Sequence, residues 1–188
     1  MITILYFHGY NGENSVKYEI LKDYFAKESV EIVKIIQTYD RRADADRVAK
    51  AMAQAKKKDR LGKFFIVGSS LGCVYSMFYS LKLQIPCLLI NPAYEVEERL
   101  KGRMEPEKLE TMLEVLRRID EMPYIPALFN VFLAEDDELL TFDKFLADFR
   151  IFRTIKRFPD KGHGFKNFEE NVEEVGYIMD HYFWESEF

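Results

Sequence analysis

Short apolar runs alternate with longer amphipathic segments along the whole chain, and this alternation predicts the secondary structure. Six runs have the length and composition of buried strands: 2–7, 30–36, 64–68, 86–90, 128–133 and 151–157. Apolar residues at helical spacing predict helices over 15–28, 43–58, 70–81, 106–120, 141–150 and 168–184. Strands that alternate with helices require crossover connections, so we expect an α/β fold whose mostly parallel sheet of about six strands has helices on both faces.

The stretch between 91 and 126 departs from this alternation. Its charged helix, 106–120, carries apolar residues on one face: Leu109, Met112, Leu113, Leu116 and Ile119. Two interpretations remain open. The helix covers the sheet as part of an ordinary crossover, or it combines with Met104 and Met122 in a short lid within 92–126 beside a ligand site. Methionine-rich surfaces adapt to flexible apolar ligands, which would suit an acyl chain.

Composition narrows the class of protein. A chain of 188 residues with 48% hydrophobic residues is predicted to fold as one domain, 1–188, with a sizeable core. The net charge of −5 gives no reason to expect nucleic acid or an anionic membrane as a partner. The first residues enter a strand without a signal-peptide pattern, and no apolar run could span a bilayer, so a cytoplasmic location is expected. Cys73 and Cys87 lie in apolar segments and are predicted to be buried thiols.

A glycine-flanked serine follows the third predicted strand, in Gly68-Ser69-Ser70-Leu71-Gly72. The pattern G-x-S-x-G at a strand-to-helix turn exposes a serine hydroxyl for nucleophilic attack. Gly68 and Gly72 leave space where side chains would clash in such a sharp turn. A helix that begins near Ser70 points free N–H groups to the place where negative charge develops. We interpret Ser70, rather than Ser69, as the nucleophile because only Ser70 has glycine two residues away on both sides.

The chain has three histidines from which a catalytic base can come. His181 falls on the side of its predicted helix opposite the core face and is expected to be exposed. His8 follows the first strand, either as a residue that positions the site or as a loop histidine bonded to backbone. His163 lies between two glycines in a loop after the last strand, where an imidazole can reach both a nucleophile and a carboxylate. We therefore predict that His163 is the base.

The acid partner is expected directly after the strand 128–133, where four carboxylates follow one another from Glu135 to Glu138. A carboxylate at this place can bind the imidazole N–H and stabilise the imidazolium that forms. Chemistry alone does not choose among the four, and three of them are expected to belong to a solvated loop. Asp137 and Asp136 are the main candidates. Asp160 is disfavoured because it is only three residues from His163.

Two backbone N–H groups are needed to hold an oxyanion. Leu71, which follows the nucleophile, is expected to supply one. The other is expected from Tyr10, because Gly9 lets the chain turn after the first strand.

These motifs resemble the α/β-hydrolase superfamily and, more narrowly, the small bacterial YqiA-type esterases. The matching segments are 6–11 (YFHGYN), 67–72 (VGSSLG), 91–93 (NPA), 137–140 (DELL) and 162–165 (GHGF). The family pattern, Asp-Glu-apolar after a strand, selects Asp137 as the acid. The resemblance implies a three-layer α/β-hydrolase core with esterase activity on small-to-medium acyl esters or thioesters.

The expected chemistry is a Ser-His-Asp mechanism that passes through an acyl-enzyme and uses a small-molecule ester or thioester. We expect no metal and no organic cofactor, since the chain lacks H-E-x-x-H, zinc-spaced cysteines, G-x-G-x-x-G and a phosphate-loop motif. One alternative is an acyl-CoA or carrier thioesterase or an acyltransferase, with Arg41 and Arg42 as candidate phosphate contacts. A second is a catalytically inactive binding protein on the same scaffold.

Overall fold

A computed structural model describes residues 1–183 and contains a six-stranded sheet in the order β2-β1-β3-β4-β5-β6. The strands are β1 Ile2–Phe7, β2 Val30–Ile35, β3 Lys63–Ser69, β4 Cys87–Ile90, β5 Phe129–Ala134 and β6 Thr154–Phe158. Every neighbouring pair is parallel. The predicted parallel sheet is therefore confirmed, although β6 begins three residues later than expected.

The helices follow the predicted order, with small shifts at their ends. They are α1 Val16–Tyr24, α2 Arg41–Lys58, α3 Gly72–Leu83, α4 Val96–Leu100, α5 Pro106–Asp120, α6 Asp143–Asp148 and α7 Val172–Phe183. Short 3-10 turns follow α1 and precede β5 and α7: Phe25–Lys27, Pro126–Leu128 and Phe168–Asn171. The last residue of the predicted helix 168–184 lies outside the described residues. Helix α4 was not predicted, because five residues are too few to show a helical period.

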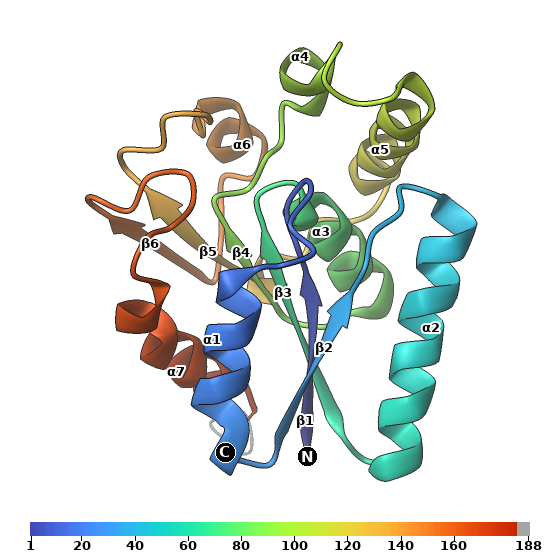
Figure 1. The fold of residues 1–188 in the computed structure, drawn as a ribbon, viewed down its shortest axis with the longest axis vertical. Coiled ribbons are helices and arrows are strands. Elements are labelled where there is room, and N and C mark those ends of the chain that lie inside the picture. The colour runs from blue at the N-terminus through green and yellow to red at the C-terminus, as the bar shows by residue number, and fades with distance from the viewer. Residues whose placement is uncertain (184–188) are drawn as a thin grey trace.

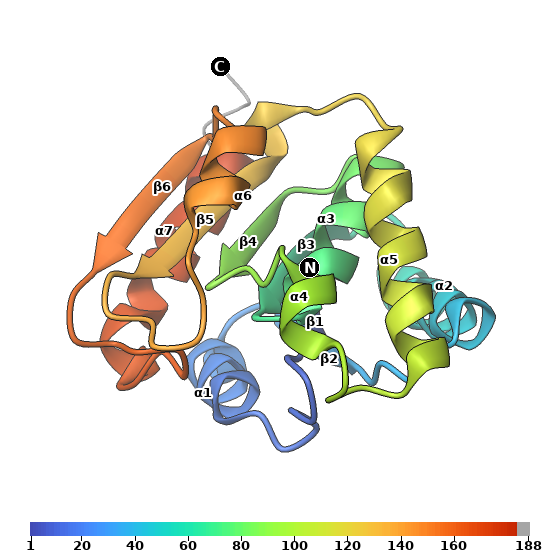
Figure 2. The same ribbon diagram turned by 90° about the horizontal axis from the view of Figure 1, so that it is seen from above.

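Helices cover both faces of the sheet, which gives three layers (Figures 1 and 2). On β1, Ile4 and Tyr6 pack in the layer of α1 and α7, while Leu5 and Phe7 pack in the layer of α2, α3 and α5. All four side chains are fully buried. A central strand of a parallel sheet must bury both of its faces, which explains the uninterrupted apolar run at 2–7.

The candidate chemistry lies at the carboxyl edge of this sheet. The chain reverses its direction of winding beside β1, since β2 lies on one side of it and β3 to β6 on the other. In open parallel sheets the loops at such a point separate and leave room for a ligand. Helix α4 lies above this edge (Figure 1). The loops after β1, β3, β4, β5 and β6 begin at the same edge.

Candidate active site

Ser70 occupies a strained turn between β3 and α3. Its φ is 52°, a left-handed conformation that is uncommon for a residue with a side chain. The turn is fixed by backbone hydrogen bonds: the Ser70 N–H donates to the Ile90 carbonyl at 2.9 Å, and the Ala93 N–H donates to the Ser70 carbonyl at 3.2 Å. Strain of this kind persists only where the surrounding structure enforces it, and here it presents the hydroxyl to the loops of the other strands.

The glycines around Ser70 allow backbone segments to approach one another. A Cβ on Gly72 would lie 2.3 Å from the Phe7 carbonyl oxygen, and one on Gly68 would lie 2.3 Å from Ser76 Oγ. A Cβ on Gly9 would lie 3.2 Å from Ser70 Cβ. Neighbouring atoms therefore fill the places that side chains at 68 and 72 would need, as the sequence pattern predicted. A side chain at either position would shift the backbone of the turn.

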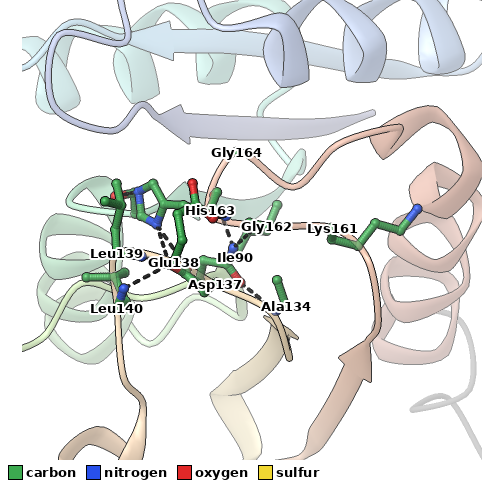
Figure 3. A network of polar contacts seen from close by, with 12 residues as sticks. Ile90, Ala134, Asp137, Glu138, Leu139, Leu140, Lys161, Gly162, His163 and Gly164 are labelled. Atoms are coloured by element: carbon green, nitrogen blue, oxygen red, sulfur yellow. Dashed lines mark hydrogen bonds and ion pairs between the residues drawn. The ribbon is translucent and has the colours of Figure 1, made fainter.

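Ser70, His163 and Asp137 form a continuous chain of hydrogen bonds. Ser70 Oγ lies 2.9 Å from His163 Nε2. His163 Nδ1 lies 2.9 Å from Asp137 Oδ2 and 3.1 Å from Oδ1 (Figure 3). The Asp137 side chain is 1% exposed and that of His163 is 20% exposed, so the carboxylate is shielded while the imidazole borders solvent. Of the acids considered from the sequence, Asp137 is the one whose carboxylate contacts His163 Nδ1.

The acid loop after β5, which carries the four acidic residues, makes several hydrogen bonds to backbone N–H groups. Asp137 Oδ1 accepts the N–H groups of Leu139 and Leu140, which holds the carboxylate in place. The exposed side chains of Asp136 and Glu138 accept hydrogen bonds from backbone N–H groups of the histidine loop, residues 161–164. Glu135, Asp136 and Glu138 are exposed, as expected of a solvated loop, but the sequence did not predict that two of them also bind the histidine loop.

Those hydrogen bonds also change the acidity of the two carboxylates. Donation from the Gly162 and Lys161 N–H groups holds the pKa of Asp136 below its ordinary value. Donation from the His163 N–H does the same for the pKa of Glu138. Both side chains therefore remain ionised at neutral pH.

His8 and His181 do not contact the triad. His8 is buried, its Nδ1–H donates to the Gly9 carbonyl at 2.7 Å, and its Nε2 faces the Gln37 N–H at 3.4 Å. These contacts tie the His8 ring to the loop after β1 and to the segment that follows β2. His181 is exposed on α7 and stacks on the ring of Tyr177, on the side of the helix that the sequence predicted.

The two expected oxyanion donors border the same space as the nucleophile. Tyr10 and Leu71 both line the cavity that contains Ser70 and His163. Leu71 immediately precedes α3, so its N–H belongs to the unpaired donors at the start of a helix. The Tyr10 hydroxyl donates to the Arg103 carbonyl at 3.1 Å, which ties the loop after β1 to the turn after α4.

The cavity beside Ser70 has a volume of about 1120 Å³. Its walls come from α1, from the loops after β1, β5 and β6, and from α4 with the turn 101–103. Helix α5 does not border it, because Met112, Val115 and Ile119 pack into the core on α3. Met104 and Met122 also join that core, so the part of 92–126 that borders the cavity is Ala93, α4 and the turn 101–103.

Charged side chains surround the cavity unevenly. The basic residues that border it are Lys17, Arg99, Lys101, Arg103 and Lys166, and the acidic ones are Glu98, Glu138 and Glu169. The excess of positive charge contrasts with the chain's net charge of −5. Arg41 and Arg42 are not among the lining residues, and Arg41 pairs with Glu114 of α5 instead.

The cysteine nearest the nucleophile is not a competing one. Cys73 and Cys87 are both buried and unbridged, as the sequence predicted. Burial raises the pKa of the Cys73 thiol well above its ordinary value. Because the thiolate is the reactive form, this thiol is inert at neutral pH.

The order of the parallel strands, the left-handed serine after β3 and the loops at the carboxyl edge are those of the α/β-hydrolase fold. The chain matches the Uncharacterised protein family (UPF0227) over residues 3–179, and it belongs to that family.

Solved structures with the same fold include Est1E from Butyrivibrio proteoclasticus, with a TM-score of 0.70 and 15% identity, covering 95% of this chain and 86% of that one. A structure from work on LipS and LipT, two metagenome-derived lipolytic enzymes, has a TM-score of 0.66 and 15% identity, covering 96% of this chain and 94% of that one. Human thioesterase 2 has a TM-score of 0.56 and 11% identity, covering 95% of this chain and 94% of that one.

None of the helices within residues 1–183 is both long and apolar enough to cross a bilayer. Over the same residues, no group of three or more His, Cys, Asp or Glu side chains is arranged to hold a metal ion.

Proposed function

We propose that this chain is a serine hydrolase that cleaves small-to-medium acyl esters or thioesters of small molecules. The observation that carries the proposal is the hydrogen-bond chain from Ser70 Oγ through the His163 ring to the shielded Asp137 carboxylate. A serine hydroxyl is a weak nucleophile until a base of this kind is oriented beside it. The shared fold with lipolytic enzymes and a thioesterase supports the same class of reaction.

The proposed mechanism gives each of these groups one role. As Ser70 Oγ attacks the substrate carbonyl carbon, His163 Nε2 takes its proton and Asp137 stabilises the resulting imidazolium. The N–H groups of Leu71 and Tyr10 hold the oxyanion. Collapse of the intermediate expels an alcohol or thiol, which takes the proton from His163, and leaves an acyl-enzyme on Ser70. A water molecule activated by His163 then releases the acid.

A thioesterase acting on acyl-CoA or a carrier-bound acyl group is the second candidate. The basic side chains around the cavity favour a leaving group that carries phosphate. Kinetics with butyryl-CoA and 4-nitrophenyl butyrate separate the two readings. A higher kcat/KM for the coenzyme A thioester that falls steeply with added salt would select the thioesterase.

Labelling with a fluorophosphonate probe tests the proposed function directly. Such a probe reacts with serines that already have a base and an oxyanion site. We expect peptide mass spectrometry to find the adduct on Ser70, and Ser70→Ala to lower kcat by at least about 10⁴-fold. His163→Ala should abolish labelling, whereas the matched variant Ser69→Ala should keep it. Folded wild-type protein that neither labels nor hydrolyses esters would favour the binding protein instead.

A further inference from the structure

The histidine loop, residues 161–164, is held in place mainly by side chains from distant parts of the chain. Within the loop region, backbone bonds from Phe165 N–H to the Gly162 carbonyl and from Lys166 N–H to the Lys161 carbonyl close a turn. Six further hydrogen bonds join the backbone of this loop to side chains of residues that precede it by 23 or more positions. The position of the imidazole therefore depends on those side chains.

Asn91, which follows β4, makes two of these contacts and a third hydrogen bond to the end of β5, so both the oxygen and the nitrogen of its amide are used. Its Nδ2 donates to the Gly162 and His163 carbonyls, both at 3.1 Å. Its Oδ1 accepts the Ala134 N–H at 2.7 Å. The residue is 1% exposed, so these contacts are not exchanged with water. Its φ of 46° is a conformation that asparagine tolerates better than most residues.

Side chains from the acid loop and α1 hold the other groups of the histidine loop. Asp136 Oδ1 accepts the N–H groups of Lys161 and Gly162, and Glu138 Oε2 accepts the His163 N–H, each at 2.9 Å. Lys17 Nζ donates to the Gly164 carbonyl at 2.6 Å. The N–H groups of the histidine loop thus donate to carboxylates of the acid loop, and its carbonyls accept from Asn91 and Lys17.

We propose that Asn91 is a positioning residue that sets His163 between Ser70 and Asp137. Its Oδ1 fixes the end of β5, three residues before Asp137, and its Nδ2 fixes the backbone of His163. One rigid, buried amide therefore determines the separation of the base from its acid. This inference rests on the proposed function, since it assigns how the triad of that reaction is assembled. Misplacing a reacting group by about 1 Å can cost about 100-fold in rate.

The substitution Asn91→Asp tests the proposal with little change in shape. It keeps an oxygen for the Ala134 N–H and tolerates the left-handed backbone, but it replaces the two N–H donors with an acceptor facing two carbonyls. We expect kcat for 4-nitrophenyl butyrate to fall about 10- to 100-fold while KM changes less than about threefold. The rate of fluorophosphonate labelling should fall by the same factor as kcat.

Asn130→Asp is the matched control. Asn130 is also fully buried, and its Nδ2 donates to the Cys87 carbonyl, but it lies near the start of β5, away from the triad. This variant should lower the melting temperature and leave kcat per folded molecule unchanged. If Asn91→Asp does not fold, Asn91→Gly carries the test, because glycine accepts the positive φ and adds no charge; the same fall in kcat is expected.

A second pair of variants probes the same positioning at the surface. Glu138→Ala removes the acceptor for the His163 N–H, whereas Glu138→Gln keeps an oxygen there. We expect the glutamine variant to recover most of the kcat that the alanine variant loses.

Folded Asn91→Asp or Asn91→Gly with the wild-type kcat would overturn the inference while leaving the proposed function intact. An equal fall of kcat in Asn130→Asp would also overturn it, since the effect would then come from any buried charge. A wild-type protein that neither labels nor hydrolyses would overturn the proposed function, and the inference with it.

Discussion

The turn at Ser70 and the loop at His163 are held in two different ways. The nucleophile turn is fixed by close backbone packing, with Gly72 against the Phe7 carbonyl and with backbone hydrogen bonds to Ile90 and Ala93. The histidine loop is fixed by hydrogen bonds with the side chains of Lys17, Asn91, Asp136 and Glu138. The first arrangement depends on the shape of a short segment, and the second depends on chemistry supplied from elsewhere.

This difference determines how each region responds to change. Backbone packing fails when atoms are added, because main-chain neighbours cannot move aside without shifting a strand or helix. Side-chain contacts fail when a donor or acceptor is removed or neutralised, because the loop then loses a specific bond. Substitutions and pH can therefore perturb one region while sparing the other.

Of the variants that separate the two regions, Asp137→Asn is expected to have the largest effect, because it alters the polar contacts of His163 and leaves the turn at Ser70 untouched. The carboxamide can still accept the Leu139 and Leu140 N–H groups through its oxygen. Its NH₂ group then donates to His163 Nδ1, so the single ring proton moves to Nε2. A protonated Nε2 cannot accept the proton of the Ser70 hydroxyl. We expect kcat to fall by about 10³- to 10⁴-fold in an esterase assay, with an unchanged melting temperature.

The matched variant for that prediction is Asp136→Asn. It keeps an oxygen for the Lys161 and Gly162 N–H groups and does not touch the imidazole. Its kcat should stay within about tenfold of the wild type. A comparable loss in both variants would contradict the assignment of Asp137 as the triad acid.

Gly72→Ala should damage the nucleophile turn through the fold itself. Its Cβ would lie 2.3 Å from the Phe7 carbonyl oxygen and 2.5 Å from that of His8, and both are backbone atoms. Because α3 or the end of β1 must shift, we expect the free energy of unfolding to fall by about 3 kcal/mol, measured by urea denaturation.

Gly164→Ala is the corresponding addition in the histidine loop. A Cβ there meets nothing within 4 Å, and the φ of Gly164 lies outside the positive range. The unfolding free energy should change by less than about 1 kcal/mol, with a small gain if the unfolded chain loses entropy. Equal destabilisation by the two variants would show that the regions do not differ in this way.

The same difference explains which parts of the fold and of the candidate site could be predicted from the sequence. The order of strands and helices was predicted and is confirmed, because apolar periodicity is a local pattern. Ser70 was predicted from the local pattern G-x-S-x-G and His163 from its glycine-flanked loop, and their side chains lie within hydrogen-bond distance. The contacts of Asn91, Asp136 and Glu138 were missed, since they join segments up to 72 positions apart. The Asn91-Pro92-Ala93 segment carried a signal only through its resemblance to a family, which gave Asn91 no role. Short α4 was missed because a single turn and a half leaves no periodicity to detect.

The smallest effect expected is a local loosening of the histidine loop in acid. Asp136 and Glu138 have pKa values held below their ordinary ones, so their contribution is complete above pH of about 4 and is lost as pH falls through the lowered values. The amides of Gly162 and His163 should then lose hydrogen-exchange protection as the pH falls below about 4, measured by NMR against a reference at pH 6. The Ser70 amide donates to a backbone carbonyl that does not titrate, and should keep its protection. Glu138→Gln should remove the pH dependence at His163 alone, because an amide oxygen accepts equally well at both pH values; parallel loss at all three amides would instead indicate global unfolding.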